Sequence, residues 1–113
     1  MRILIIEPDE YYHRQFQDNL SEIAELRLLR RLEEALRALT EEKFDLIITE
    51  LLLADGHAYD FLPKVRNIPV AVYTNLDHLE DVQQSLNLGV MSYFVKGRDT
   101  INDVKRLALT LNT

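Results

Sequence analysis

Four short apolar runs in this chain each stop at a charged or hydroxyl-bearing residue, and they cover residues 2–6, 46–49, 70–73 and 93–95. If these runs are parallel strands of one sheet, their carboxyl ends lie along one edge of that sheet. Open α/β sheets hold their functional groups in the crevice outside this edge. We therefore expect the polar residues at the strand ends to converge on one small pocket. These residues are Glu7, Asp9, Glu50, Thr74 and Lys96.

Helical segments separate the strands. The spacing of Tyr12, Phe16, Leu20 and Ile23 predicts a helix over about 10–22, with Asp9 as its N-cap, Tyr12 in the core and Tyr11 on the surface. Further helices are expected over 33–43 and around 58–66. A fourth helix is expected to run to about residue 88 from an N-cap at Asn75 or Asp77. A fifth is expected to run to about residue 111 from an N-cap at Asp99 or Thr100. The strands are expected at 2–7, 26–31, 45–50, 68–74 and 92–95. Strand and helix alternate five times, which predicts a parallel sheet with helices on both faces.

The size and composition of the chain fit one domain that covers residues 1–113. The sequence has no cysteine, which excludes disulfides, thiolate metal sites and cysteine nucleophiles. No apolar run approaches the ~20 residues that span a bilayer, and no signal-peptide pattern precedes the first strand, so we expect a cytoplasmic domain. The three histidines lack metal-ligand spacing and are expected at the surface: His13, His57 and His78.

The charge of the chain argues against binding to nucleic acid. Its formal net charge is −6, whereas neutralising phosphates requires a basic surface. The one basic cluster, Arg27, Arg30 and Arg31, is interleaved with leucines and followed by acidic residues. It is typical of the solvated face of an edge element rather than of a phosphate-binding patch. A small-ligand binder is also disfavoured, because no glycine-rich phosphate loop follows any strand.

The placement of these residues resembles the receiver domain of bacterial response regulators over essentially the whole chain. Residues 44–56 resemble the third strand and following loop of that family, and 70–74 resemble its fourth strand. Residues 89–96 resemble the stretch around the family's lysine, here Lys96, and Tyr93 lies where the family has its aromatic switch residue. The resemblance implies a flavodoxin-like fold, with a five-stranded parallel sheet in the order 2-1-3-4-5 that alternates with five helices.

The sequence departs from the family pattern where phosphotransfer begins. Glu50 stands at the phosphoacceptor position, which is an aspartate in the family, and its extra methylene moves the carboxylate by roughly 1 Å. Pro8 replaces the second of two acidic residues, which supplies a carboxylate ligand to magnesium, while Glu7 keeps the first. Asp9 lies one residue further on and remains a candidate ligand with Glu7 and Glu50. We expect weakened magnesium binding, no other cofactor, and no efficient phosphotransfer.

Several residues keep two interpretations. Glu50 could reach Lys96 or Thr74 and imitate a phosphorylated aspartate, or it could lie at a solvated strand end without a role. For Thr74 and Lys96 we favour structural charge compensation over retained phosphate binding. Tyr93 is either a switch or an ordinary packed aromatic residue. Asp55 could be a substitute acceptor, although an aspartate in a glycine-containing turn more often makes local hydrogen bonds.

The function implied by the resemblance is that of an atypical receiver domain in two-component-type signal transduction. We expect it to act as a phosphorylation-independent protein-interaction module and not as an enzyme, with residual autophosphorylation left open. Its partner would be a kinase, an effector domain or a second copy of the chain, bound through the fourth helix, fifth strand and fifth helix. The alternative is a phosphorylation-competent receiver that uses magnesium and an unusual acceptor carboxylate.

Overall fold

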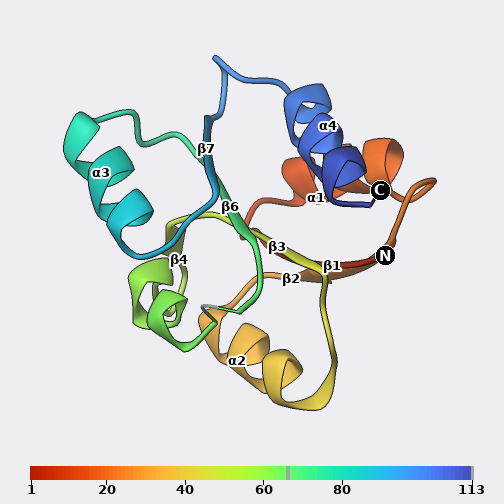
Figure 1. Cartoon of the computed structure of the whole chain (residues 1–113), viewed down its shortest axis with the longest axis horizontal. Helices are drawn as coiled ribbons and strands as arrows, with labels where there is room; N and C mark the ends of the chain where they lie inside the picture. Colours follow the sequence, from red (N-terminus) through yellow and green to blue (C-terminus); the bar gives the residue numbers. More distant parts are fainter. Residues whose placement is uncertain (66, 113) are drawn as a thin grey trace.

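The central sheet of the computed structural model has five parallel strands in the order β2-β1-β3-β6-β7 (Figure 1). The structure describes residues 1–65 and 67–112. Counted along the chain, this order is 2-1-3-4-5, which confirms the flavodoxin-like architecture expected from the sequence. The strands are β1 (Arg2–Ile6), β2 (Glu25–Leu29), β3 (Leu46–Thr49), β6 (Val70–Thr74) and β7 (Ser92–Val95).

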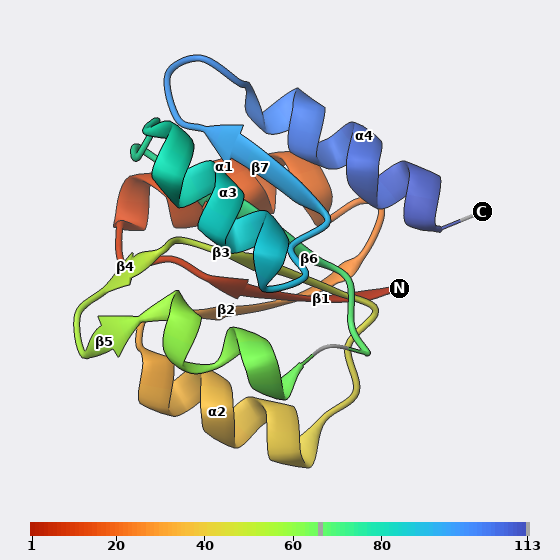
Figure 2. The ribbon, with the colours of Figure 1, turned by 60° about the vertical axis from the view of Figure 1, so that its left-hand side comes forward.

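Helices cover both faces of the sheet (Figures 1 and 2). Helices α1 (Glu10–Leu20) and α4 (Ile101–Leu111) pack on one face, and α2 (Leu32–Glu41) packs on the other. Two short 3₁₀ helices, η1 (Ala58–Asp60) and η2 (Leu62–Lys64), join α2 on that second face. Helix α3 (Leu79–Asn87) lies beside η1, where the Tyr59 hydroxyl donates to the Asp81 carbonyl over 3.3 Å. The five expected helical regions are thus all present.

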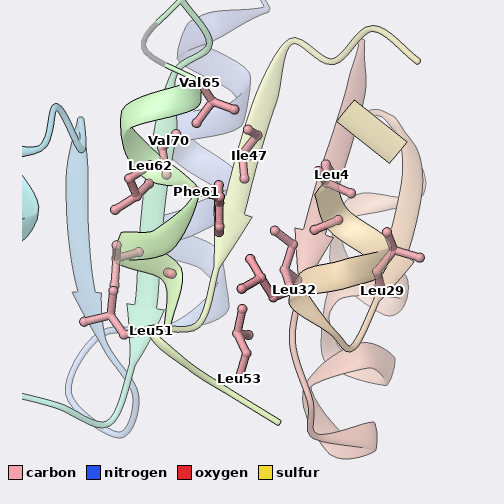
Figure 3. Close-up of a cluster of buried hydrophobic side chains, with 14 of the residues drawn as sticks. Leu4, Leu29, Leu32, Ile47, Leu51, Leu53, Phe61, Leu62, Val65 and Val70 are labelled. Carbon is pink, nitrogen blue, oxygen red and sulfur yellow. The ribbon is translucent and has the colours of Figure 1, made fainter. Parts of the chain in front are cut away.

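Each strand contributes to two separate hydrophobic cores. Along β1, Ile3 and Ile5 point toward α1 and α4, whereas Leu4 and Ile6 point toward α2, as the two-residue period of a strand requires. Figure 3 shows the second core, in which Ile47 and Val70 of the sheet lie among leucines and Phe61 from the covering elements. The nearly continuous apolar character of the strands follows from this burial on both faces.

Proline explains two differences from the expected boundaries. The third helical region, expected around 58–66, consists of the two 3₁₀ helices, because Pro63 has no N–H for a continuous α-helix; its expected end at 66 lies outside the described residues. The fourth strand begins at Val70 rather than Ile68, because Pro69 cannot donate to the sheet. The loop after the third strand contains a small hairpin of β4 (Leu52–Leu53) and β5 (Gly56–His57).

The caps of the helices were partly predictable. Asp9 caps α1, its Oδ1 accepting from the Tyr11 N–H over 2.9 Å, and Thr100 caps α4. The expected cap of α3 at Asn75 or Asp77 is wrong, because that helix begins only after His78. In the segment before this helix, the Leu76 carbonyl accepts from the distant Tyr93 hydroxyl over 2.8 Å. Among the described helices, none is long and apolar enough to cross a bilayer.

Candidate functional site

Four of the five residues expected at the strand ends are buried at the carboxyl edge of the sheet. Glu7 follows β1, Glu50 follows β3, Thr74 ends β6 and Lys96 follows β7, and each is at most 8% exposed. Within the described part of the chain this edge contains no pocket, so the expected pocket is absent. The space is filled by the charged side chains themselves.

The ammonium group of Lys96 lies between two carboxylates. Its Nζ is 2.7 Å from Glu7 Oε1 and 3.0 Å from Glu50 Oε1, and the Lys96 side chain is only 3% exposed. The contact with Glu50 that the sequence suggested is therefore present, and Glu7 is a second partner. With both carboxylates ionised, this buried cluster has a net charge of −1. We call Glu7, Glu50 and Lys96 the charged cluster.

The two carboxylates differ in how well they are satisfied. Glu50 Oε2 accepts from the Leu51 N–H over 2.6 Å and, more weakly, from the Leu52 N–H over 3.4 Å, while its Oε1 accepts from Lys96. Glu7 Oε2 accepts from the Asp9 N–H over 3.1 Å. Glu7 Oε1 forms an ion pair with Lys96 at 2.7 Å and has no other polar partner among the described residues. Glu7 is the weaker-held carboxylate.

Burial and charge act in opposite directions on these groups. Desolvation raises the pKa of Glu7 above its ordinary value of 4.5, although the hydrogen bonding and charge of Lys96 act against this shift. Desolvation alone would lower the pKa of Lys96, but contact with Glu7 and the charge of Glu50 outweigh it and raise this pKa. Lys96 therefore stays cationic, and ionisation of Glu7 is less favourable than that of a solvated glutamate.

His13 is buried beside the charged cluster, so its expected position at the surface is wrong. Its Nε2 donates to the Glu7 carbonyl over 2.5 Å, and the residue is 8% exposed. In α1 the buried residues are His13, Phe16 and Leu20, which have the spacing of one helix face. The helical spacing of these three residues therefore indicated that His13 is buried. The prediction followed instead the polar character of histidine, which favours the surface.

Two aromatic rings also lie close to the ammonium group of Lys96. The centroid of the Tyr12 ring is 4.2 Å from Lys96 Nζ, and that of Tyr73 is 5.7 Å away. The two rings pack edge to face with centroids 5.6 Å apart. Tyr12 also contacts Tyr11, which is 60% exposed, as expected from the sequence. Tyr12 itself is half-buried against the core that contains Phe16.

Thr74 and Tyr93 both contact the segment that follows β6. Thr74 Oγ1 accepts from the Leu76 N–H over 3.3 Å, and the Tyr93 hydroxyl donates to the Leu76 carbonyl. Burial, followed by the nearby charge of Asp81, raises the pKa of the Tyr93 phenol. Tyr93 is half-buried in this arrangement, in which it connects β7 to the start of the α3 region.

Asp9, a candidate for the acidic pocket and for a metal site, does not join the charged cluster. It is exposed, and its carboxylate caps α1, because Pro8 places it one residue beyond the family's acidic position. Within residues 1–65 and 67–112 no group of three or more His, Asp or Glu side chains is placed to hold a metal. The residues therefore do not fit the magnesium ion of the resembled family: Pro8 has no side-chain ligand atom, and Glu7 and Glu50 already share the ammonium group of Lys96.

Asp55 has a structural role that the sequence did not reveal. From the turn between β4 and β5, its Oδ1 accepts from the Leu32 N–H over 2.7 Å and its Oδ2 from the Glu33 N–H over 3.0 Å. The Glu33 hydrogen bond lowers the pKa of the Asp55 carboxyl. Asp55 thus caps α2 from a distant segment and holds the hairpin after Glu50, while the neighbouring Leu53 lies in the core (Figure 3).

Comparison with known proteins identifies the fold. No family model matches the chain, and no curated protein matches it either. Among solved structures, a two-component response regulator from Clostridium difficile is 25% identical, with a TM-score of 0.90 over 98% of this chain and 94% of that one. The chain has the receiver-domain fold.

Two further structures agree with this assignment of the receiver fold. A CheY-like response regulator receiver domain protein from Methanospirillum hungatei is 23% identical, with a TM-score of 0.86 over 98% of this chain and 93% of that one. The non-phosphorylated HemR receiver domain from Leptospira biflexa is 21% identical, with a TM-score of 0.86 over 99% of this chain and 94% of that one. At the level of the fold, the resemblance found in the sequence is confirmed.

Proposed function

We propose that this chain is a receiver domain of two-component-type signal transduction that acts through protein contacts without phosphorylation at Glu50. The observation that carries the proposal is the position of Lys96, which is held between Glu7 and Glu50 in a buried cluster. Such a cluster already contains the contact between the lysine and an anion that phosphorylation would otherwise create. The domain then needs no covalent modification to hold this arrangement.

The contacts of Glu50 support the absence of phosphotransfer. One of its oxygens accepts from backbone N–H groups and the other accepts from Lys96, and the side chain is only 10% exposed, so a phosphodonor has little access to this carboxylate. Its carboxylate is also displaced by roughly 1 Å relative to an aspartate, and errors of this size are costly in catalysis. Neither Pro8 nor Asp9 supplies the missing metal ligand, so the charge developing on the phosphoryl oxygens would lack a cation.

The same contacts support Glu50 as a fixed negative charge. Glu50 is 8% exposed and bonded to Lys96, which is unlike a solvated strand end. A glutamate brings about one negative charge and two acceptor oxygens, whereas a phosphoryl group brings about −2 and three. Glu50 therefore imitates the phosphorylated state only in part, through its contact with Lys96.

The proposed interaction surface consists of α3, β7 and α4, which are the fourth helix, fifth strand and fifth helix of the expected fold (Figure 1). Leu79 and Leu86 lie seven residues apart on one side of α3 and are 70% and 49% exposed. Met91 and Leu109 are further exposed apolar residues at β7 and α4. These exposed apolar residues would contribute to a contact surface for a protein partner, here a kinase, an effector domain or a second copy.

The proposal is tested by incubation with a small phosphodonor and magnesium, followed by intact mass measurement. We expect no phosphate adduct on the wild type or on Glu50→Asp, because Pro8 still removes a metal ligand. The double variant Pro8→Asp, Glu50→Asp restores both family residues and serves as the positive control. A stable adduct on wild-type Glu50 or Asp55 would support the alternative, a phosphorylation-competent receiver.

The interaction surface is tested by sedimentation velocity over a range of protein concentrations. If the partner is a second copy, Leu79→Ser with Leu86→Ser will shift the association to higher concentration. Leu52→Ser is the matched control, because Leu52 is 55% exposed but lies in β4, outside the proposed surface. An equal effect of the control and the double variant would contradict the assignment of the surface.

A further inference from the structure

Two chemically different kinds of group surround Lys96 Nζ. Carboxylate oxygens of Glu7 and Glu50 lie at 2.7 and 3.0 Å. The centroid of the Tyr12 ring lies at 4.2 Å, and that of the Tyr73 ring lies further away at 5.7 Å. The four residues come from α1, β6 and the ends of β1 and β3, so the tertiary fold creates this arrangement.

This combination of groups is suited to an alkylammonium ion rather than to a divalent metal. Carboxylates accept charge-assisted hydrogen bonds from N–H groups, and the electron-rich face of an aromatic ring attracts an organic cation. Magnesium instead requires about six oxygen ligands in near-octahedral geometry, and aromatic carbons supply none. In addition, Glu7 Oε1 is buried and has no hydrogen-bond partner among the described residues, and Lys96 Nζ lies 2.7 Å from it, so the cation is what compensates this acceptor.

We propose that Glu7, Glu50, Tyr12 and Tyr73 form an alkylammonium-binding cage whose occupant is the side chain of Lys96. The cage is a binding site in its own right, and Lys96 is its covalently tethered ligand. This inference deepens the proposed function of the same site. Its test measures amine binding and lysine accessibility, not phosphorylation or partner binding, so either proposal can fail without the other.

The first experiment empties the cage with Lys96→Ala and supplies the missing atoms as a free amine. The atoms removed correspond to n-propylammonium, so we expect this ion to raise the melting temperature of the variant in a saturable way. Binding should tighten about fourfold for each methylene from methylammonium to n-propylammonium. Tetramethylammonium, which has no N–H donor, and magnesium should not reproduce the effect.

Two controls show whether the rescue occurs in the cage. Adding Glu50→Gln to Lys96→Ala should weaken the rescue, because one of the carboxylates is then neutral. Lys105→Ala, which removes a lysine from an ion pair on α4, should show no rescue at all. Equal stabilisation of all these variants, or equal effects of magnesium and n-propylammonium, would overturn the proposal.

The second experiment keeps Lys96 and alters the ring that covers it. Amine-reactive labelling followed by peptide mass mapping compares Lys96 with the exposed Lys43 and Lys64. Tyr12→Phe keeps the ring and should leave Lys96 protected, whereas Tyr12→Leu should increase its labelling rate by about 2- to 30-fold. The labelling experiment tests whether Tyr12 covers Lys96 even if the Lys96→Ala variant does not fold.

Leu20→Ala controls for a general loss of stability in the labelling experiment. Leu20 is fully buried in α1, the helix that carries Tyr12, but belongs to the hydrophobic core and not to the cage. This variant should destabilise the domain without a selective increase at Lys96. Equal labelling of Lys96 in Leu20→Ala and Tyr12→Leu would show that Tyr12 does not close a cage.

Discussion

Replacing Lys96 with methionine tests whether the charged cluster is a buried ion network. Methionine has a similar length but no charge, so the change removes the shared cation and leaves Glu7 and Glu50 buried without it. Removing one partner of a buried ion pair costs about 3–5 kcal/mol. A domain of this size has an unfolding free energy of about 5–15 kcal/mol, so the variant should still fold at 25 °C with much reduced stability.

The cost should depend on pH in a defined direction. Without Lys96, the pKa of Glu7 loses the influence that lowers it, so it rises further above 4.5 in the folded state. The folded state then binds a proton more tightly than the unfolded chain, and stability falls as pH rises from 4.5 through the folded pKa. The deficit of Lys96→Met should therefore be largest at neutral pH and shrink toward pH 4.5.

Urea unfolding of the wild type and of Lys96→Met, between pH 4.5 and neutral pH, measures the difference in their unfolding free energies. The matched control is Lys105→Met, whose partner Glu22 is 66% exposed, and its effect should be much smaller. Adding Glu7→Gln and Glu50→Gln to Lys96→Met should recover stability, because no buried charge is then left unpaired. A deficit below about 1 kcal/mol at neutral pH, without pH dependence, would refute a buried network, because exposed pairs have that magnitude.

Three smaller perturbations give further predictions. Wild-type stability should fall as pH rises from 4.5 through the raised folded pKa of Glu7, and Glu7→Gln should remove this slope in urea titrations. Tyr93→Phe removes the hydrogen bond to the Leu76 carbonyl and should cost about 0.5–1.5 kcal/mol in the same assay. Asp55→Ala removes the cap of α2 and should lower the melting temperature by a few degrees. Because the pKa of Asp55 is lowered from 3.8, its contribution should be present above that pH and lost as pH falls through the folded pKa.

The three central strands of the sheet, β1, β3 and β6, were predictable because they are buried on both faces and are therefore almost continuously apolar. A continuous apolar run such as 46–49 indicates a buried strand by itself. The carboxyl ends of these strands define the edge of the sheet at which the charged cluster lies. The third helical region was harder, since Pro63 divides it into two 3₁₀ helices although the apolar residues around it continue. The beginning of α3 was missed because its N-cap, His78, makes no side-chain cap hydrogen bond and is not a typical capping residue.

The candidate site was predictable as a set of residues but not as a set of contacts. The strand ends bring Glu7, Glu50 and Lys96 together because the parallel sheet places them at one edge. The local sequence around Asp9 does not show that its carboxylate caps α1 rather than entering the cluster. Asp55 is similar, because it caps α2 across 22 to 23 residues of sequence, and only the tertiary fold defines that contact.

Charge balance explains why Pro8 and the closed cluster occur together. The present cluster has two carboxylates and one ammonium group, with a net charge of −1 that can be buried. A carboxylate at position 8, as in the resembled family, would raise this charge to −2 at the same edge. Position 8 is half-buried, so an additional charge there, close to two buried carboxylates, favours a cation nearby. We propose that Pro8 removes both a side-chain metal ligand and the need for a metal.

The variant Pro8→Asp tests this reasoning through its response to magnesium. In the presence of a chelator it should be less stable than the wild type, because the added carboxylate repels Glu7 and Glu50. Magnesium at tenfold above its dissociation constant should restore about 1.4 kcal/mol, whereas the wild type should not respond. Pro8→Asn adds a similar side chain without the charge and should show neither effect. Equal stabilisation of the wild type and Pro8→Asp by magnesium would contradict the argument, because the existing cluster would then already bind the metal.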